Sequence, residues 1–173
     1  MLETILSYVV PLVAVGLSYI FGKMQATASE KSKAEREAYE TFYLPFITLL
    51  YQTRIWNIGF AYLGLKERCQ LFKLVVENIK YMDKETLEYI DILYVHYGAI
   101  LGKELLDVDS VFTHERANEI FDGLTEKVLC RATWLAKRLH QPCIGEFVLE
   151  LYCEMTEDRE KQRTEVVRYN AHN

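Results

Sequence analysis

The sequence has few of the residues that break regular structure or cross-link a chain. Its 173 residues include only three Pro, eight Gly and four Cys. So little Pro and Gly excludes a collagen-like or Pro-rich chain and argues against a turn-dominated all-β domain. Four Cys are too few for a small disulfide-rich scaffold. An excess of positive charge is also missing, since 20 Lys and Arg stand against 25 Asp and Glu. We therefore expect no binding of nucleic acid through a basic surface.

The motifs of common catalytic and cofactor sites are absent from the sequence. No Glu-x-x-His pair is present for a di-iron bundle, and no His-Glu-x-x-His for a zinc helix. Neither a Gly-Lys-Ser/Thr phosphate loop nor a Gly-x-Ser-x-Gly nucleophile turn occurs. We therefore expect no cofactor, and a protein that is not an enzyme.

One cluster of Cys and His keeps an alternative open. His140 and Cys143 lie three residues apart, and Cys130 and Cys153 flank them. Cys and His are usual zinc ligands, so these four residues are candidates for a metal site or for an enzyme that uses a Cys/His cluster. Paired motifs such as Cys-x-x-Cys are missing. We favour the interpretation that the Cys are small buried side chains and that His140 ends a helix.

The most apolar stretch of the chain is at residues 2–21, where Glu3 is the single charged residue. A helix rises about 1.5 Å per residue, so about 20 residues cover the roughly 30 Å hydrocarbon core of a bilayer. We predict that residues 1–22 form one transmembrane helix, with the lipid bilayer as its partner.

The flanking basic residues predict the orientation of this helix. No Lys or Arg precedes it, whereas Lys23, Lys31, Lys33 and Arg36 follow it. The positive-inside rule then places the short N-terminus outside the cell membrane and the remaining chain in the cytoplasm, where the four Cys stay free thiols. Two alternatives are a buried soluble helix and a cleaved signal peptide, since Ala26-Thr27-Ala28 imitates a cleavage site. Cleavage would make the chain an exported helical protein with disulfides.

Small residues recur at four-residue spacing along the predicted membrane helix. Ala14, Ser18 and Gly22 fall on one helix face. Rows of this kind let two helix backbones approach closely in lipid. They are therefore a candidate packing face for self-association, although small residues are also common in membrane helices that do not pair.

The rest of the sequence predicts an all-α protein. Residues 23–40 are charged helix formers without Gly or Pro and predict a solvated stalk. Residues 41–160 show apolar positions three and four residues apart and no alternating strand pattern, which predicts a bundle of about five helices. Residues 161–173 form a polar tail that we expect to fray. The expected helices are 41–65, with Pro45 at its start or at a kink and Gly59 or Gly64 at its end, then 66–82, 84–106 after an Asp83 N-cap, 114–140 and 144–159.

Two charge patterns in the bundle are candidates for a structural or binding role. Arg54 lies in the most apolar segment after residue 22, so we predict that it is buried beside an acid such as Glu88 or Asp91, or that it reaches the surface. Glu146, Glu150 and Glu154 form a row along one helix, where like charges repel. The row is an acidic docking stripe, a cation site, or a solvated face opposite Phe147, Leu151 and Met155.

These observations together favour a non-catalytic interaction or scaffold module held at the membrane. Its expected partners are the bilayer and either a protein partner or a second copy. A metal-binding protein or Cys/His enzyme, and an exported helical protein, remain the alternatives.

Overall fold

The computed structural model describes residues 23–106 and 114–171 and divides into two compact units. The first unit ends at Glu37, and the second begins at Ala38. In the first unit, residues 23–37 are helical and their side chains are exposed from Lys23 to Ala34. In the second unit, every described element is a helix. The predicted all-α class is therefore confirmed.

The predicted membrane segment cannot be compared with this structure. Residues 1–22, and with them Ala14, Ser18 and Gly22, lie outside the described residues. Within 23–106 and 114–171, no helix combines the length and the apolar character that a membrane span requires.

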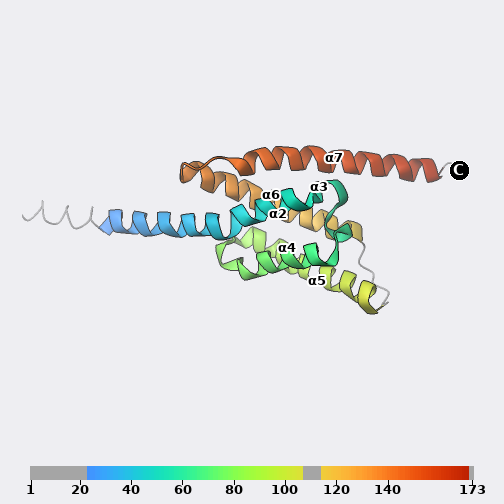
Figure 1. Ribbon diagram of the computed structural model, residues 1–173, viewed down its shortest axis with the longest axis horizontal. Helices are drawn as coiled ribbons and strands as arrows, with labels where there is room; N and C mark the ends of the chain where they lie inside the picture. The colour runs from blue at the N-terminus through green and yellow to red at the C-terminus, as the bar shows by residue number, and fades with distance from the viewer. Residues whose placement is uncertain (1–22, 107–113, 172–173) are drawn as a thin grey trace, which may run out of the picture. The chain divides into compact units, whose positions relative to one another are not determined.

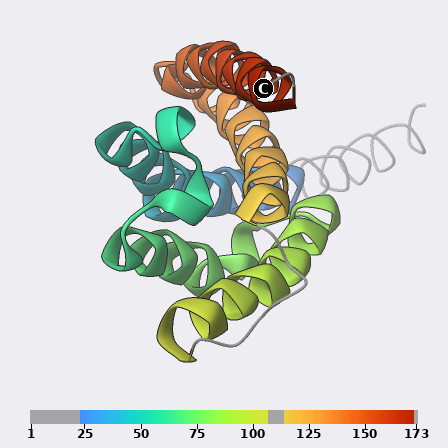
Figure 2. The ribbon, with the colours of Figure 1, turned by 90° about the vertical axis from the view of Figure 1, so that its right-hand side faces the viewer.

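The second unit contains six α-helices, together with short π and 3-10 turns, among its described residues (Figure 1). Helix α6 is central, because it packs against α5 on one side and α7 on the other (Figure 2). Helix α2 packs against α4 and α7, and the short α3 packs against α7. The elements are η1 (Tyr39–Tyr43), α2 (Leu44–Thr53), α3 (Ile55–Ile58), η2 (Phe60–Tyr62), α4 (Leu65–Glu77), η3 (Ile79–Tyr81), α5 (Lys84–Leu106), α6 (His114–Arg138) and α7 (Ile144–Ala171).

The chain enters the bundle through the π-helical turn η1. Pro45 lies in the first turn of α2, as predicted for the start of a helix. Because Pro lacks an N–H and its ring crowds the carbonyl one turn earlier, the preceding backbone widens instead of continuing as a regular α-helix. The wide turn buries Tyr39, Phe42 and Tyr43. The Tyr43 hydroxyl then donates a hydrogen bond to the Tyr81 carbonyl (2.9 Å).

Aromatic rings from distant parts of the chain meet in the core. Phe60 of η2 stacks on Phe121 of α6 with ring centroids 4.6 Å apart. Phe46 of α2 approaches the same Phe121 ring, and Tyr97 of α5 meets Phe60 edge-on. All four side chains are buried. Aromatic pairs of this geometry add about 0.5–1.5 kcal/mol each beyond area burial, so they hold α2, α5 and α6 together.

The start of α5 confirms the predicted N-cap. Asp83 Oδ1 accepts hydrogen bonds from the Thr86 backbone N–H (2.9 Å) and the Thr86 hydroxyl (2.8 Å). The bond from the backbone N–H, joined by the one from the hydroxyl, lowers the pKa of Asp83. This side chain therefore satisfies an otherwise unpaired donor at the end of the helix.

Two predicted helix boundaries differ from the structure. The expected helix 41–65 breaks at Arg54, whose backbone is left-handed (φ 48°), and Gly59 (φ 84°) ends the short α3. This break makes six α-helices where about five were expected. The last helix, expected over 144–159, continues as α7 to Ala171.

Candidate functional site

The structure does not bring the four Cys/His candidates into one metal site. Among the described residues, no group of three His, Cys, Asp or Glu side chains is arranged to hold a metal ion. Cys130 and Cys153 are exposed on α6 and α7, and Cys143 is half-buried at the turn between these helices. The prediction that the thiols are buried is therefore wrong for Cys130 and Cys153. None of the three forms a disulfide.

His140 has a conformational role at the end of α6. Its backbone is left-handed (φ 55°), and the following Gln141 N–H donates to the Ala136 carbonyl (2.8 Å). A hydrogen bond from an N–H to the carbonyl five residues earlier, after a left-handed residue, is the Schellman motif that ends many helices. The prediction that His140 lies at a helix end is therefore confirmed. The imidazole itself is exposed.

The surroundings of the Cys153 thiol disfavour its thiolate form. Partial burial, followed by the nearby Glu126 carboxylate, raises its pKa. Because the thiolate is the reactive form, a raised pKa lowers its population at neutral pH. The raised pKa therefore does not favour covalent catalysis through this thiol.

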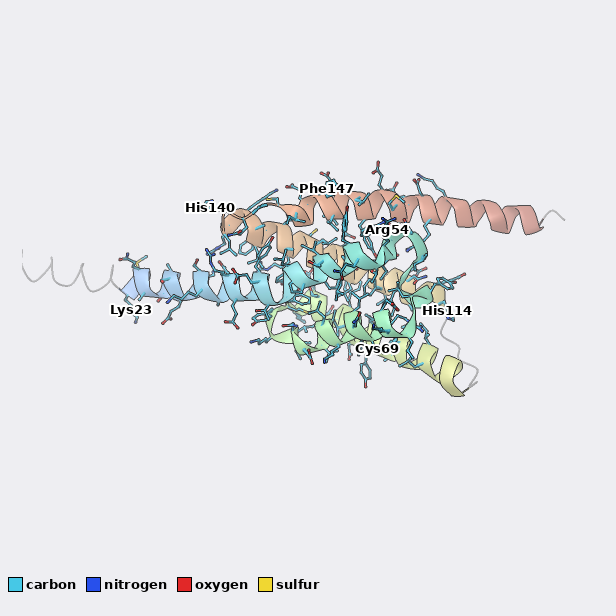
Figure 3. All side chains as sticks on the ribbon, in the orientation of Figure 1. Lys23, Arg54, Cys69, His114, His140 and Phe147 are labelled. Carbon is cyan, nitrogen blue, oxygen red and sulfur yellow. The ribbon has the colours of Figure 1, made fainter. Side chains whose placement is uncertain are left out.

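The side chain of Arg54, labelled in Figure 3, is exposed. Of the two predicted positions, the one at the surface is therefore correct and the buried pair with an acid is wrong. The helix ends one residue earlier, and the left-handed turn leaves the side chain in solvent. The candidate partners Glu88 and Asp91 are themselves exposed on α5. Among the residues that the structure describes, Arg68 on α4 is a buried cation; it is 3% exposed and donates to the Ala61 carbonyl (3.3 Å).

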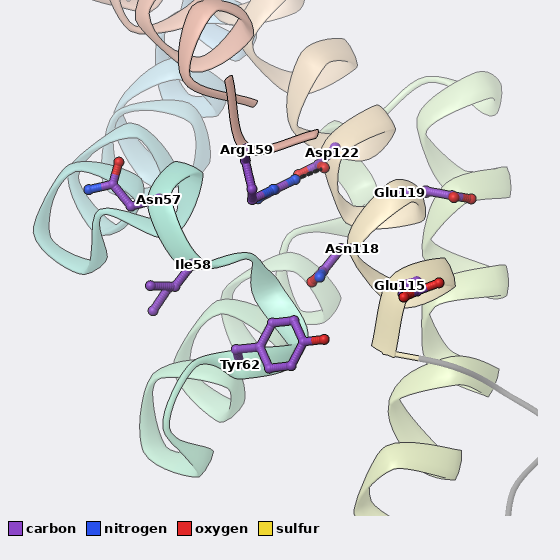
Figure 4. Close-up of a pocket in the computed structure, with 8 residues that line it drawn as sticks. All are labelled: Asn57, Ile58, Tyr62, Glu115, Asn118, Glu119, Asp122 and Arg159. Atoms are coloured by element: carbon purple, nitrogen blue, oxygen red, sulfur yellow. Dashed lines mark hydrogen bonds and ion pairs between the residues drawn. The ribbon is translucent and has the colours of Figure 1, made fainter. Parts of the chain in front are cut away.

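A polar cleft lies between the α3–η2 segment, α6 and α7 (Figure 4). Arg159 of α7 forms an ion pair with Asp122 of α6, and both side chains are about one-fifth exposed. The Tyr152 hydroxyl donates a hydrogen bond to Asp122 Oδ1 (2.6 Å), and Arg159 also reaches the Trp56 carbonyl (3.5 Å). The cleft is lined by Asn57, Ile58, Tyr62, Glu115, Asn118, Glu119, Asp122 and Arg159.

Asn118 joins the floor of this cleft to the bend after α3. Its Oδ1 accepts a hydrogen bond from the Ala61 N–H (2.8 Å), and the residue is buried, with a relative exposure of 7%. Gly59 sits directly against it, since a Cβ at Gly59 would lie 2.7 Å from Asn118 Nδ2. The bend therefore needs glycine for two reasons, its positive φ and this close approach.

The polar groups of the cleft serve mainly to hold α7 against α6 and α3. Burial, followed by the Asp122 carboxylate, raises the pKa of Tyr152 well above its ordinary value, so this hydroxyl stays neutral and donates. The cleft volume is about 160 Å³, below the roughly 300–1,000 Å³ of typical small-molecule sites. We therefore assign the Asp122–Arg159 pair a structural role.

A second depression, the apolar groove, runs between α2 and the start of α7 and has a volume of about 420 Å³. Ile47 and Val148 are buried beneath it. Phe147 is 61% exposed and Tyr51 is 57% exposed, and they stand on opposite helices (Figure 3 labels Phe147). Surface patches of this kind commonly mark binding sites. The apolar groove is lined by Leu44, Ile47, Thr48, Tyr51, Gln52, Ile144, Phe147 and Val148.

The predicted acidic row lies along α7, the helix whose first residues line one side of the apolar groove. Glu146 Oε1 is 2.7 Å from Lys137 Nζ. Glu150 and Glu154 are exposed and have no ion-pair partner among the described residues. They follow Phe147 by three and seven residues, which places all three on one side of α7. The prediction placed the row opposite Phe147, whereas Glu150 and Glu154 lie on the same side of α7 as Phe147.

The sequence contained a signal for this rotation of α7. The side facing the core carries Gly145, Val148 and Tyr152, and a Cβ at Gly145 would meet Thr133 Oγ1 at 3.0 Å. A glycine followed by apolar residues three and seven positions later marks the contact with α6 more correctly than Phe147 does. No comparable local signal predicts the Asp122–Arg159 pair, which joins residues 37 positions apart.

Comparison with known families, characterised proteins and solved structures finds no match to this chain. The functional argument therefore rests on the geometry of the apolar groove and the polar cleft.

Proposed function

We propose that this chain is a single-pass membrane protein whose helical bundle binds a partner protein at the cytoplasmic face of the cell membrane. The bundle acts as an interaction module and catalyses no reaction. The observation that carries the proposal is the apolar groove, where Phe147 and Tyr51 are both more than half exposed. Large aromatic side chains bury much area at low entropic cost, and they are enriched at protein interfaces.

The polar cleft supports a role other than catalysis. Its best-placed charged groups, Asp122 and Arg159, are engaged with each other and with Tyr152 and the Trp56 carbonyl. A catalytic acid or base has to exchange protons with a bound substrate. Groups already satisfied within the protein hold the fold together instead.

The membrane anchor rests on the sequence of residues 2–21, with its single charged residue, Glu3. The basic residues that follow it favour a cytoplasmic bundle. An anchor restricts the bundle to the membrane plane and so raises its effective concentration toward other membrane-bound proteins.

Site-specific photo-crosslinking of the full chain in cells tests the binding role. A photoreactive phenylalanine analogue is placed at Phe147 or, as a matched control, at Tyr94. Tyr94 is an aromatic residue on α5 with similar exposure, 63% against 61%. We expect a discrete adduct from position 147 that disappears with a second substitution, Tyr51→Asp, on the opposite side of the groove. Equal adducts from both positions, or none from position 147, would contradict the proposal.

Alkaline carbonate extraction of the same cells tests the anchor. We expect the chain to stay in the membrane pellet and to keep residues 1–22. Release into the supernatant would refute the anchor, and a mature N-terminus at Ser29 would show export instead.

A further inference from the structure

The shape of the apolar groove suits the binding of a helix. Its two walls are helices, and its lining on α2 runs from Leu44 to Gln52. Eight residue steps along a helix cover about 12 Å, or slightly more than two turns. An amphipathic partner helix presents apolar residues at three- and four-residue spacing over such a length.

The two charged residues that follow Phe147 within two turns of α7 are both acidic. Glu150 and Glu154 flank Phe147 on the α7 side, whereas Thr48 and Gln52 make the polar part of the α2 side. No Lys or Arg is among the residues that line the groove. An occupant that buries Phe147 therefore also approaches two carboxylates that pair with no cation in the described part of the chain.

Resting on the proposed function, we propose that the partner docks an amphipathic helix whose apolar stripe is bordered by Lys or Arg. The apolar stripe fills the groove over Ile47 and Val148, and the basic border meets Glu150 and Glu154. Complementary charge at the edge of an interface sets orientation and selects among partners of equal hydrophobicity.

The same carboxylates argue against two other occupants. A symmetric dimer through this face would place Glu150 and Glu154 of both copies at one interface, with no Lys or Arg among the residues that line the groove to pair with them. An anionic lipid surface would likewise be repelled by Glu150 and Glu154. A basic helix is the occupant whose charge this face favours.

Binding of labelled helical peptides to the full chain tests the inference. The protein is held in phosphatidylcholine nanodiscs, and empty nanodiscs supply the background. Three fluorescent peptides of equal length share one leucine stripe and differ only in its border, which is Lys, Gln or Glu. We expect the Lys peptide to bind tightest. The variant Glu150→Gln/Glu154→Gln should weaken the Lys peptide about fivefold at low salt and leave the Gln peptide unchanged. High salt should remove the difference between the Lys and Gln peptides.

Two variants of the same chain complete this design. Glu88→Gln/Asp91→Asn removes two exposed carboxylates from α5, outside the apolar groove, and should leave the preference for Lys intact. Phe147→Asp should weaken the Lys and Gln peptides alike.

The outcomes separate the inference from the proposed function. Three results would overturn the proposal of a helix with a basic border. They are equal binding of the Lys and Gln peptides, a preference for Lys that survives Glu150→Gln/Glu154→Gln, and no peptide binding at all. If the Gln peptide still binds and Phe147→Asp weakens it, the groove remains a binding site. Peptide binding that Phe147→Asp does not weaken refutes the groove itself. A crosslinked adduct from position 147 with the mass of a dimer assigns the groove to a second copy and overturns the inference.

Discussion

Gly59→Ala is predicted to be among the most damaging small substitutions in this fold. The backbone of Gly59 has φ 84° and ψ 154°, a region that is essentially restricted to glycine, and holding another residue there costs about 1–3 kcal/mol. The new Cβ would also lie 2.7 Å from Asn118 Nδ2 and 2.8 Å from Oδ1. Asn118 must then move and release the buried N–H of Ala61, which costs about a further 1–3 kcal/mol. The predicted loss of unfolding free energy is the sum of the two, roughly 2–6 kcal/mol.

A double-mutant cycle separates these two contributions. Asn118→Ala alone loses the hydrogen bond to Ala61 but leaves the backbone of Gly59 unstrained. In the Asn118→Ala background, Gly59→Ala should cost only the backbone strain, so the two substitutions should be less than additive by about 1–3 kcal/mol. Gly98→Ala is the matched control. It lies within α5, where a new Cβ would have no atom of another residue within 4 Å, and it should stabilise the protein by about 0.5–1 kcal/mol.

Guanidinium denaturation of the full chain in mild detergent measures these changes. The buried Trp56, in the short helix that Gly59 ends, provides a local fluorescence signal, and far-ultraviolet circular dichroism follows the whole helical fold. A loss below about 0.5 kcal/mol for Gly59→Ala would refute the reasoning, since surface substitutions commonly fall in that range. Strict additivity with Asn118→Ala would show that the close approach of the two residues carries no energy.

Three other substitutions test separate parts of the fold. Asp83→Ala should cost about 1 kcal/mol by removing the N-cap of α5. Folding lowers the pKa of Asp83, so its contribution to the unfolding free energy is present above the unfolded pKa of 3.8 and is lost as the pH falls through the folded pKa. Plots of unfolding free energy against pH for the native protein and Asp83→Ala should therefore converge in acid. Arg159→Met should cost about 1–3 kcal/mol by leaving Asp122 partly buried without its cation, and thermal melting would measure it; an unchanged melting temperature would contradict the assigned structural role. His140→Gly should stabilise the protein by about 0.5–1 kcal/mol because its left-handed backbone favours glycine, and a lower denaturation midpoint would show that the imidazole makes a necessary contact.

The features that the sequence predicts well are those decided by neighbours in the chain. The Asp83 cap depends on Thr86, three residues away, and the first turn of α2 depends on the covalent geometry of Pro45. Apolar spacing likewise predicts the all-α class. For the Asp83 cap and for Pro45, the whole physical cause lies within one helical turn.

The features that the sequence predicts badly depend on how helices rotate and meet. The apolar neighbours of Arg54 favour a buried position, yet a single left-handed residue turns its side chain into solvent. Phe147 lies on one apolar stripe of α7, but Gly145 and Val148 mark the side that packs. The Asp122–Arg159 pair joins two helices. The periodicity of either helix alone carries no information about the contact between Asp122 and Arg159.

The proposed anchor and the proposed docking site are suited to each other energetically. Slightly more than two turns of partner helix bury far less than the roughly 800 Å² per partner of a standard stable interface, so an isolated groove of this size is expected to bind weakly. A tether converts such a contact into a local event at about millimolar effective concentration when the partner shares the membrane. Weak intrinsic binding then lets the partner bind when it shares the membrane and dissociate when it does not. The edge charges at Glu150 and Glu154 fit the same regime, since they select among partners without adding much affinity.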